Sequence, residues 1–136
     1  MTMSVFDISA RAMSAQMLRL NTVASNMANM SSVSTNKEDA YRPMRPVFET
    51  QFADSMQQTG MATVDVSDVV QMDREPTKSF QPDHPLANEE GYIFQAAVNA
   101  DEEMVEMMEA SRQYQNTLEV VSTLRNLMSR TMRMGS

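Results

Sequence analysis

A group of glutamates offers the first candidates for chemistry. Glu102, Glu106 and Glu109 share one face of an expected helix, with Glu103 beside them, and carboxylate oxygens can bind a hard cation. The same residues stand at the expected start of that helix, where the helix dipole favours negative charge. We prefer this second interpretation and predict no metal ion at the group.

Other residues that could catalyse a reaction are sparse. His84 is the only histidine, in the segment PDHP, and the chain has no cysteine that could join it in a metal site or act as a nucleophile. The three glycines are scattered, so no glycine-rich loop can hold a phosphate group. We therefore predict that the protein is not an enzyme and binds no cofactor.

The stretch LNTVASNMANMSS, from Leu20 to Ser32, raises a different question. Asparagine is unfavourable inside a helix because its amide competes for backbone hydrogen bonds, yet Asn21, Asn26 and Asn29 stand within a helical pattern. Uncharged amides suit hydrogen bonding to a neighbouring molecule. A simpler explanation is that asparagines and serines mark the fraying end of the helix, which accounts for Asn29 and accounts poorly for Asn21.

The charge and composition of the chain limit the classes of partner that it could bind. The chain has 136 residues, enough for one domain, and eleven basic against eighteen acidic residues give a net charge of −7. Because the basic residues are dispersed, nucleic acid is not an expected partner. The N-terminus lacks the features of a cleavable signal, and no apolar run reaches the roughly 20 residues of a membrane span. Export from the cytoplasm would need another route.

The elements that must position these residues are two long helices, one at each end of the chain. From Phe6 to about Met30, apolar residues recur alternately every four and three positions, the spacing of a coiled-coil seam. The second helix should begin at Asn99, which forms a capping box with Glu102. We predict that the helices pair through a seam made of Phe6, Ala10, Met13, Met17, Leu20, Ala24, Met27, Tyr114, Leu118, Val121, Leu124 and Met128.

The middle of the chain has a different character. All five prolines lie between residues 31 and 98, so long helices are excluded and strands are expected near 45–52, 62–70 and 92–98. Residues 73–91 are predicted to form a long surface loop. The predicted fold is mainly α with a small β insert: an antiparallel coiled coil of terminal helices, with the β-rich region at one end. The predicted domain boundaries are 1–33 and 98–136 for the inner helical domain and 34–97 for the middle region.

The side of the first helix that faces away from this seam carries few charges. Between Phe6 and Met30 only Asp7, Arg11 and Arg19 are charged, and a helix that is apolar or small all round is normally buried. In so short a chain, we expect other molecules to supply that burial. The residues predicted to face neighbouring subunits are Asn21, Ser25, Asn26, Ala28 and Asn29.

Several motifs, taken in order, resemble those of flagellar axial proteins, and above all the rod proteins of the flagellar basal body. The segments FDISARAMSAQ, YRPMRPVF, HPLANEEGYI, EEMVEMMEASRQYQNTLEVV and LMSRTM extend the resemblance over nearly the whole chain. Within LNTVASNMANMSS the family motif matches at Leu20, Asn21, Ala24, Asn26, Met27, Ala28 and Asn29. The resemblance implies a structural subunit that polymerises into the proximal rod.

The resemblance also implies partners and a location. The subunit would pass through the flagellar type III export apparatus without signal cleavage and join a rod that transmits motor torque across the periplasm. It would contact other copies of itself, other proximal and distal rod subunits, the MS ring and the export gate. A second interpretation is a cytosolic helical adaptor or export chaperone that binds a partner helix through the same apolar surface. Strong hydrogen-exchange protection of residues 6–30 in a monomer would favour the adaptor.

Overall fold

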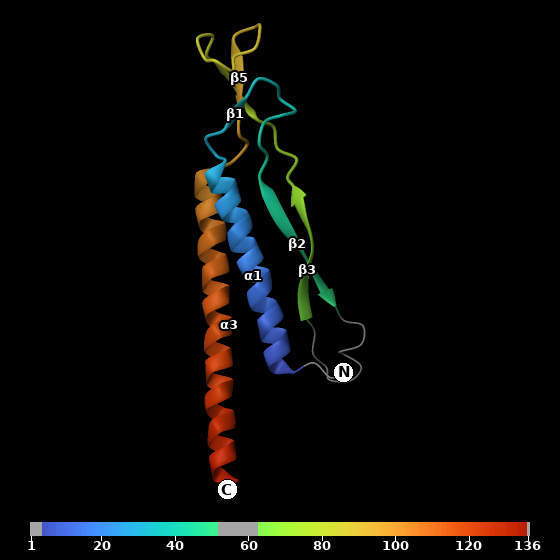
Figure 1. The fold of residues 1–136 in the computed structure, drawn as a ribbon, viewed down its shortest axis with the longest axis vertical. Helices are drawn as coiled ribbons and strands as arrows, with labels where there is room; N and C mark the ends of the chain where they lie inside the picture. Colours follow the sequence, from blue (N-terminus) through green and yellow to red (C-terminus); the bar gives the residue numbers. More distant parts are fainter. Residues whose placement is uncertain (1–3, 52–62, 136) are drawn as a thin grey trace.

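The computed structural model describes residues 4–51 and 63–135 (Figure 1). Two long helices at the ends of the chain and a β-rich middle region confirm the predicted fold class. The elements follow the chain in the order α1 (Val5–Ala28), β1 (Val33–Ser34), β2 (Met44–Gln51), β3 (Thr63–Gln71), β4 (Thr77–Phe80), β5 (Tyr92–Gln95) and α3 (Ala100–Met134).

The two helices run antiparallel and side by side (Figure 1). The side chain of Gln16 donates a hydrogen bond to Gln113 at 2.8 Å, and that of Asn26 donates one to Glu103 at 3.1 Å. These two pairs define a register in which each residue forward along α1 lies opposite one residue backward along α3. In this register the first residue of α1 lies opposite residue 124. Because α3 has 35 residues and α1 has 24, the C-terminal end of α3 extends past α1.

Local hydrogen bonds explain where each helix begins. Ser4 and Asp7 form a capping box at the start of α1, and the Ser4 backbone N–H holds the pKa of the Asp7 carboxyl below its usual value. Asn99 caps α3 as predicted, since its side-chain oxygen accepts hydrogen bonds from the backbone N–H groups of Asp101 and Glu102. The other half of the predicted capping box was wrong, because the Glu102 carboxylate accepts hydrogen bonds from Arg74 instead.

Strands β2 and β3 form an antiparallel hairpin that lies along α1 (Figure 1). Met44 pairs with Gln71 at one end of the hairpin, and residues 52 and 62 of the predicted strands lie outside the described residues. A two-stranded sheet is marginally stable alone, so packing against α1 stabilises it. The prediction that the whole middle region sits at one end was wrong, because the hairpin buries part of α1 by folding back over it.

A three-stranded antiparallel sheet, in the order β1-β5-β4, lies at the end of the helix pair (Figure 1). Strand β4 falls within residues 73–91, where the predicted loop was wrong, because the backbone of residues 77–80 pairs with β5. The turn before β5 requires Gly91, whose φ of +86° is left-handed and where an added Cβ would stand 2.9 Å from the Phe80 ring.

The buried apolar core is small for a chain of this length. Many larger apolar side chains are exposed instead, on the hairpin and along α3. A protein that leaves so much apolar surface open commonly covers it by association with other molecules. Besides Pro43 and Pro76, the buried apolar residues among those described are Ala15, Val23, Ala40, Ile93, Ala96 and Ala110.

Candidate assembly surface

Helix α1 is covered on two of its sides, by α3 and by the hairpin (Figure 1). The expectation that other molecules would bury its uncharged outer side was wrong for the part that the hairpin covers. A third side of α1, with exposed residues such as Asn21 and Ala28, is covered by none of the described helices and strands. The buried residues of the helix are Ser9, Ala15, Thr22, Val23 and Asn26, most of them small, which lets the hairpin approach closely.

The predicted seam residues of α1 fall into two groups. Four of them are half-buried: Phe6, Met13, Leu20 and Met27. Three are exposed: Ala10, Met17 and Ala24. The placement of these three in the seam was wrong, because the heptad argument assumed a single partner helix. With the hairpin as a second partner, the buried side of α1 turns toward Val23 and Asn26.

The predicted seam of α3 is also shifted. Tyr114, Val121 and Leu124 are half-buried, but Leu118 is 47% exposed and Met128 is 52% exposed. The prediction was wrong at these two positions for different reasons. Leu118 lies outside the side of α3 that contacts α1, whereas Met128 lies beyond residue 124, where α1 has no residue left to cover it.

Asn26, predicted to face another subunit, is completely buried inside the chain. Its amide oxygen accepts hydrogen bonds from the Tyr41 hydroxyl at 2.8 Å and the Met44 backbone N–H at 2.9 Å. Its amide nitrogen donates to the Met44 carbonyl at 3.0 Å and to Glu103 at 3.1 Å. The predicted outward role was therefore wrong, because this amide uses its full hydrogen-bonding capacity to join α1, β2 and α3.

Glu103 places a negative charge beside the buried amide of Asn26. Its carboxylate is completely buried, and the guanidinium of Arg45 from β2 donates hydrogen bonds to both of its oxygens. A buried carboxylate is costly unless it is both paired and hydrogen-bonded, and here Arg45 and Asn26 satisfy both conditions. The ion pair therefore fixes the start of the hairpin against the start of α3.

A second ion pair extends this arrangement toward solvent. Arg74, which follows β3, donates to both carboxylate oxygens of Glu102 and holds the pKa of that carboxyl below its usual value. Glu102 is therefore paired with arginine, where a solvated helix start had been predicted. We call this set the polar junction; it comprises the side chains of Asn26, Tyr41, Arg45, Arg74, Glu102 and Glu103 with the backbone of Met44.

Arg19 links the two helices below the polar junction. Its guanidinium lies 2.7 Å from a carboxylate oxygen of Glu106 and 3.5 Å from one of Glu109.

Within the described residues, no group of three or more acidic or histidine side chains could hold a metal ion. Neither of the helices described there has the length and apolar character to cross a membrane.

The other residues of the predicted intersubunit face lie in different environments. Asn21 and Ala28 are exposed, so their role at an interface stays a prediction. Ser25 and Asn29 are half-buried, and the Asn29 side chain donates to the Ser25 carbonyl at 2.8 Å. Asn29 is thus engaged at the end of its own helix, as the simpler explanation held.

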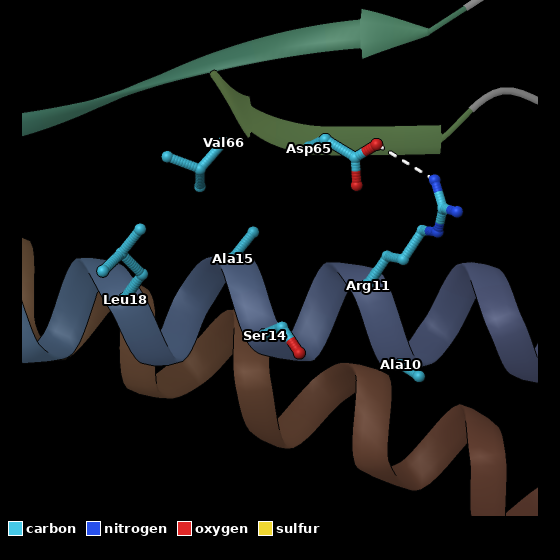
Figure 2. Close-up of a pocket in the computed structure, with 7 residues that line it drawn as sticks. All are labelled: Ala10, Arg11, Ser14, Ala15, Leu18, Asp65 and Val66. Atoms are coloured by element: carbon cyan, nitrogen blue, oxygen red, sulfur yellow. Dashed lines mark hydrogen bonds and ion pairs between the residues drawn. The ribbon is translucent and has the colours of Figure 1, made fainter. Parts of the chain in front are cut away.

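The open side of α1 is hollowed along both edges. A pocket of about 490 Å³ on the α3 side includes Met17 and Tyr114. It shares Ala10, Ser14 and Leu18 with a second pocket. We call the two pockets together the α1 trough, with α1 as its floor and β3 and α3 as its walls. Figure 2 shows the second pocket, of about 290 Å³, lined by Ala10, Arg11, Ser14, Ala15, Leu18, Asp65 and Val66.

Comparisons with known proteins relate this arrangement to a family. Residues 6–34 match the family described as "Flagella basal body rod protein", and residues 89–134 match "Flagellar basal body rod FlgEFG protein C-terminal". The flagellar basal-body rod protein FlgC of Yersinia enterocolitica is 38% identical over 133 residues, covering 98% of this chain and 97% of the relative. This chain belongs to the FlgC family. FlgC of Escherichia coli O157:H7 is 37% identical over 135 residues, with the same coverage of both chains.

A more distant relative supports the same assignment. FlgC of Aquifex aeolicus is 32% identical over 128 residues, covering 94% of this chain and 92% of the relative. As a member of the FlgC family, the chain is a structural subunit of the flagellar basal-body rod and not an enzyme. The relatives are therefore rod proteins, not adaptors or chaperones, and the matched segments contain all but the first residue of α1 and the whole of α3.

Proposed function

We propose that this rod subunit polymerises into the proximal rod, which transmits motor torque across the periplasm. One observation carries the proposal: the polar junction ties both helices and the hairpin together, while one side of α1 and the end of α3 stay open. A subunit under torque must hold its own elements fixed and use other surfaces for its neighbours. In this proposal residues 1–33 and 98–136 form the inner helical domain and residues 34–97 the middle region.

The proposal includes specific partners. They are other copies of the chain, other proximal and distal rod subunits, and the MS ring and export gate at the base of the rod. Exposed Asn21 and Ala28 on the open side of α1 are the candidate contact residues, since small uncharged side chains allow close packing with polar contacts. The proposed route is the flagellar type III export apparatus, without signal cleavage, as the resemblance to flagellar rod proteins implies.

Deletion of the gene in the source organism tests this function. We expect non-motile cells without complete rods, and we expect expression of the intact chain to restore both motility and rods. Mass spectrometry of rods isolated from the restored cells should find the N-terminal residues intact. Motile deletion cells with complete rods would overturn the structural role, whereas a chain trimmed at its N-terminus would overturn only the proposed export route.

A further inference from the structure

Among the described residues, no other helix or strand lies beside the C-terminal end of α3 (Figure 1). The helix register ends α1 opposite residue 124, and we call residues 125–134 the α3 overhang, the red end of α3 in Figure 1. Met128 and Met132 continue the helical spacing of Val121 and Leu124, yet they are 52% and 76% exposed. The side of α3 that faces α1 therefore continues into the overhang as a bare apolar surface.

The charge of the overhang is opposite to that of the rest of the chain. It holds Arg125, Arg130 and Arg133, three of the eleven basic residues, and none of the eighteen acidic ones. The rest of the chain has eight basic and eighteen acidic residues, a net charge of −10. Attraction between unlike charges therefore favours the approach of the overhang to the body of another copy.

The α1 trough provides a surface of suitable shape. Arg11 is the one charged α1 residue among those that line the two pockets, and its guanidinium lies 3.0 Å from Asp65. The exposed strip of α1 beside it is uncharged and mostly small, so a second helix can approach closely. Asp65, in the β3 wall, is already paired with Arg11, so the charges at this edge of the trough are balanced (Figure 2). The residues of the strip are Ala10, Ser14, Met17, Asn21, Ala24 and Ala28.

The overhang and the trough of one molecule cannot meet, because the overhang points away from α1 along the axis of the helix pair (Figure 1). We propose that the α3 overhang of one copy lies in the α1 trough of a second copy. This inference rests on the proposed polymerisation and names the surfaces that produce it. The contact joins two different surfaces, so each added copy still has either its trough or its overhang free to bind a further copy. Such a head-to-tail contact builds an open chain of subunits.

The size of the contact sets the conditions for testing it. At 1.5 Å per residue the overhang is about 15 Å long, so a single contact buries much less than the roughly 1,600 Å² of a stable pairwise interface. Two copies in dilute solution should therefore separate, whereas copies held in a rod should keep the contact. The contact should therefore be tested in assembled rods and not in dilute solution.

Disulfide trapping suits this chain because it contains no cysteine. We would introduce Ser14→Cys, in the trough, together with Met128→Cys, in the overhang, and oxidise rods isolated from cells that make the double variant. Within one copy the helix register separates these positions by about 20 Å along α3, far beyond the reach of a disulfide. A matched control combines Ser14→Cys with Arg112→Cys, an exposed position of α3 outside the overhang.

The expected result is a ladder of chain multiples from the Ser14–Met128 pair and none from the control pair. Rods that form without this ladder, or that yield equal ladders from both pairs, would overturn the inference and leave the proposed function standing. The same holds if the cysteine at position 14 captures a different rod protein. Absence of the chain from otherwise complete rods would overturn both.

Discussion

The two ends of the helix pair are built in opposite ways. At the polar junction, Asn26 and Glu103 are completely buried and their hydrogen bonds reach β2. At the other end, Met128 and Met132 are exposed on the part of α3 that no other described helix or strand covers. A buried ion pair tolerates few geometries, whereas an apolar surface can pack against many shapes. The junction therefore fixes the shape of the subunit, and the overhang is left for contact with its neighbours.

The largest expected effect comes from Glu103→Ala. This change leaves the Arg45 guanidinium, 17% exposed, without its main partner and removes an acceptor from Asn26. Breaking a buried ion pair from one side costs about 3–5 kcal/mol, and we expect the free energy of unfolding to fall by that amount. Urea denaturation followed by circular dichroism measures the change.

The matched control for that variant is Glu109→Ala. Its carboxylate is 46% exposed and lies 3.5 Å from Arg19, so its removal should cost less than about 1 kcal/mol. Equal losses in the two variants would show that the junction has no special weight in the stability of the subunit.

The next largest effect should come from Asn26→Leu. Leucine cannot satisfy the Met44 backbone groups or the Tyr41 hydroxyl, and unpaired buried polar groups should lower the free energy of unfolding by about 2–3 kcal/mol. Asn21→Leu, at an exposed position, should leave unfolding nearly unchanged and reduce the yield of rods instead. Thermal unfolding and rod counts separate the two effects, and matching behaviour of both variants would contradict the distinction.

The sequence was informative about elements and less so about what each one covers. Both helices were predictable because their apolar spacing repeats over many turns, and the start at Asn99 because a helix cap is a local arrangement. The position of the hairpin was not, since a strand pattern does not say which surface the strand will cover. That gap explains why Asn26 was assigned to the wrong side of α1.

Two further features had only weak signals in the sequence. The segment of β4, TKSF, is short and mostly polar, so its pairing with β5 could not be distinguished from a loop. Glu103 stands in a run of acidic residues, and nothing local marks it as the buried one. The available clue was Arg45, a charged residue within a strand pattern, which requires a partner wherever the strand packs.

A smaller change in the free energy of unfolding is expected when the pH is lowered. The bond from Arg74 lowers the pKa of Glu102, so the pair contributes stability above the unfolded-state value near 4.5 and loses it as pH falls through the folded-state pKa. Arg74→Ala should therefore reduce the acid-induced loss of unfolding free energy between about pH 6 and pH 3, by less than about 1 kcal/mol, because the pair is partly exposed. The exposed Arg112→Ala should retain the original pH dependence, and an unchanged profile in the Arg74 variant would contradict the assignment.

The smallest effect on the isolated subunit should come from the overhang. Met132 is 76% exposed and has no part of α1 opposite it, so Met132→Ser should change the free energy of unfolding by no more than about 0.5 kcal/mol. The same change removes apolar surface from the overhang and should lower the number of rods per cell. Met108→Ser, at a position 67% exposed outside the overhang, is the matched control. If Met132→Ser destabilised the monomer as strongly as Asn26→Leu does, the α3 overhang would stabilise the fold of the subunit itself, and its role as a contact surface would be contradicted.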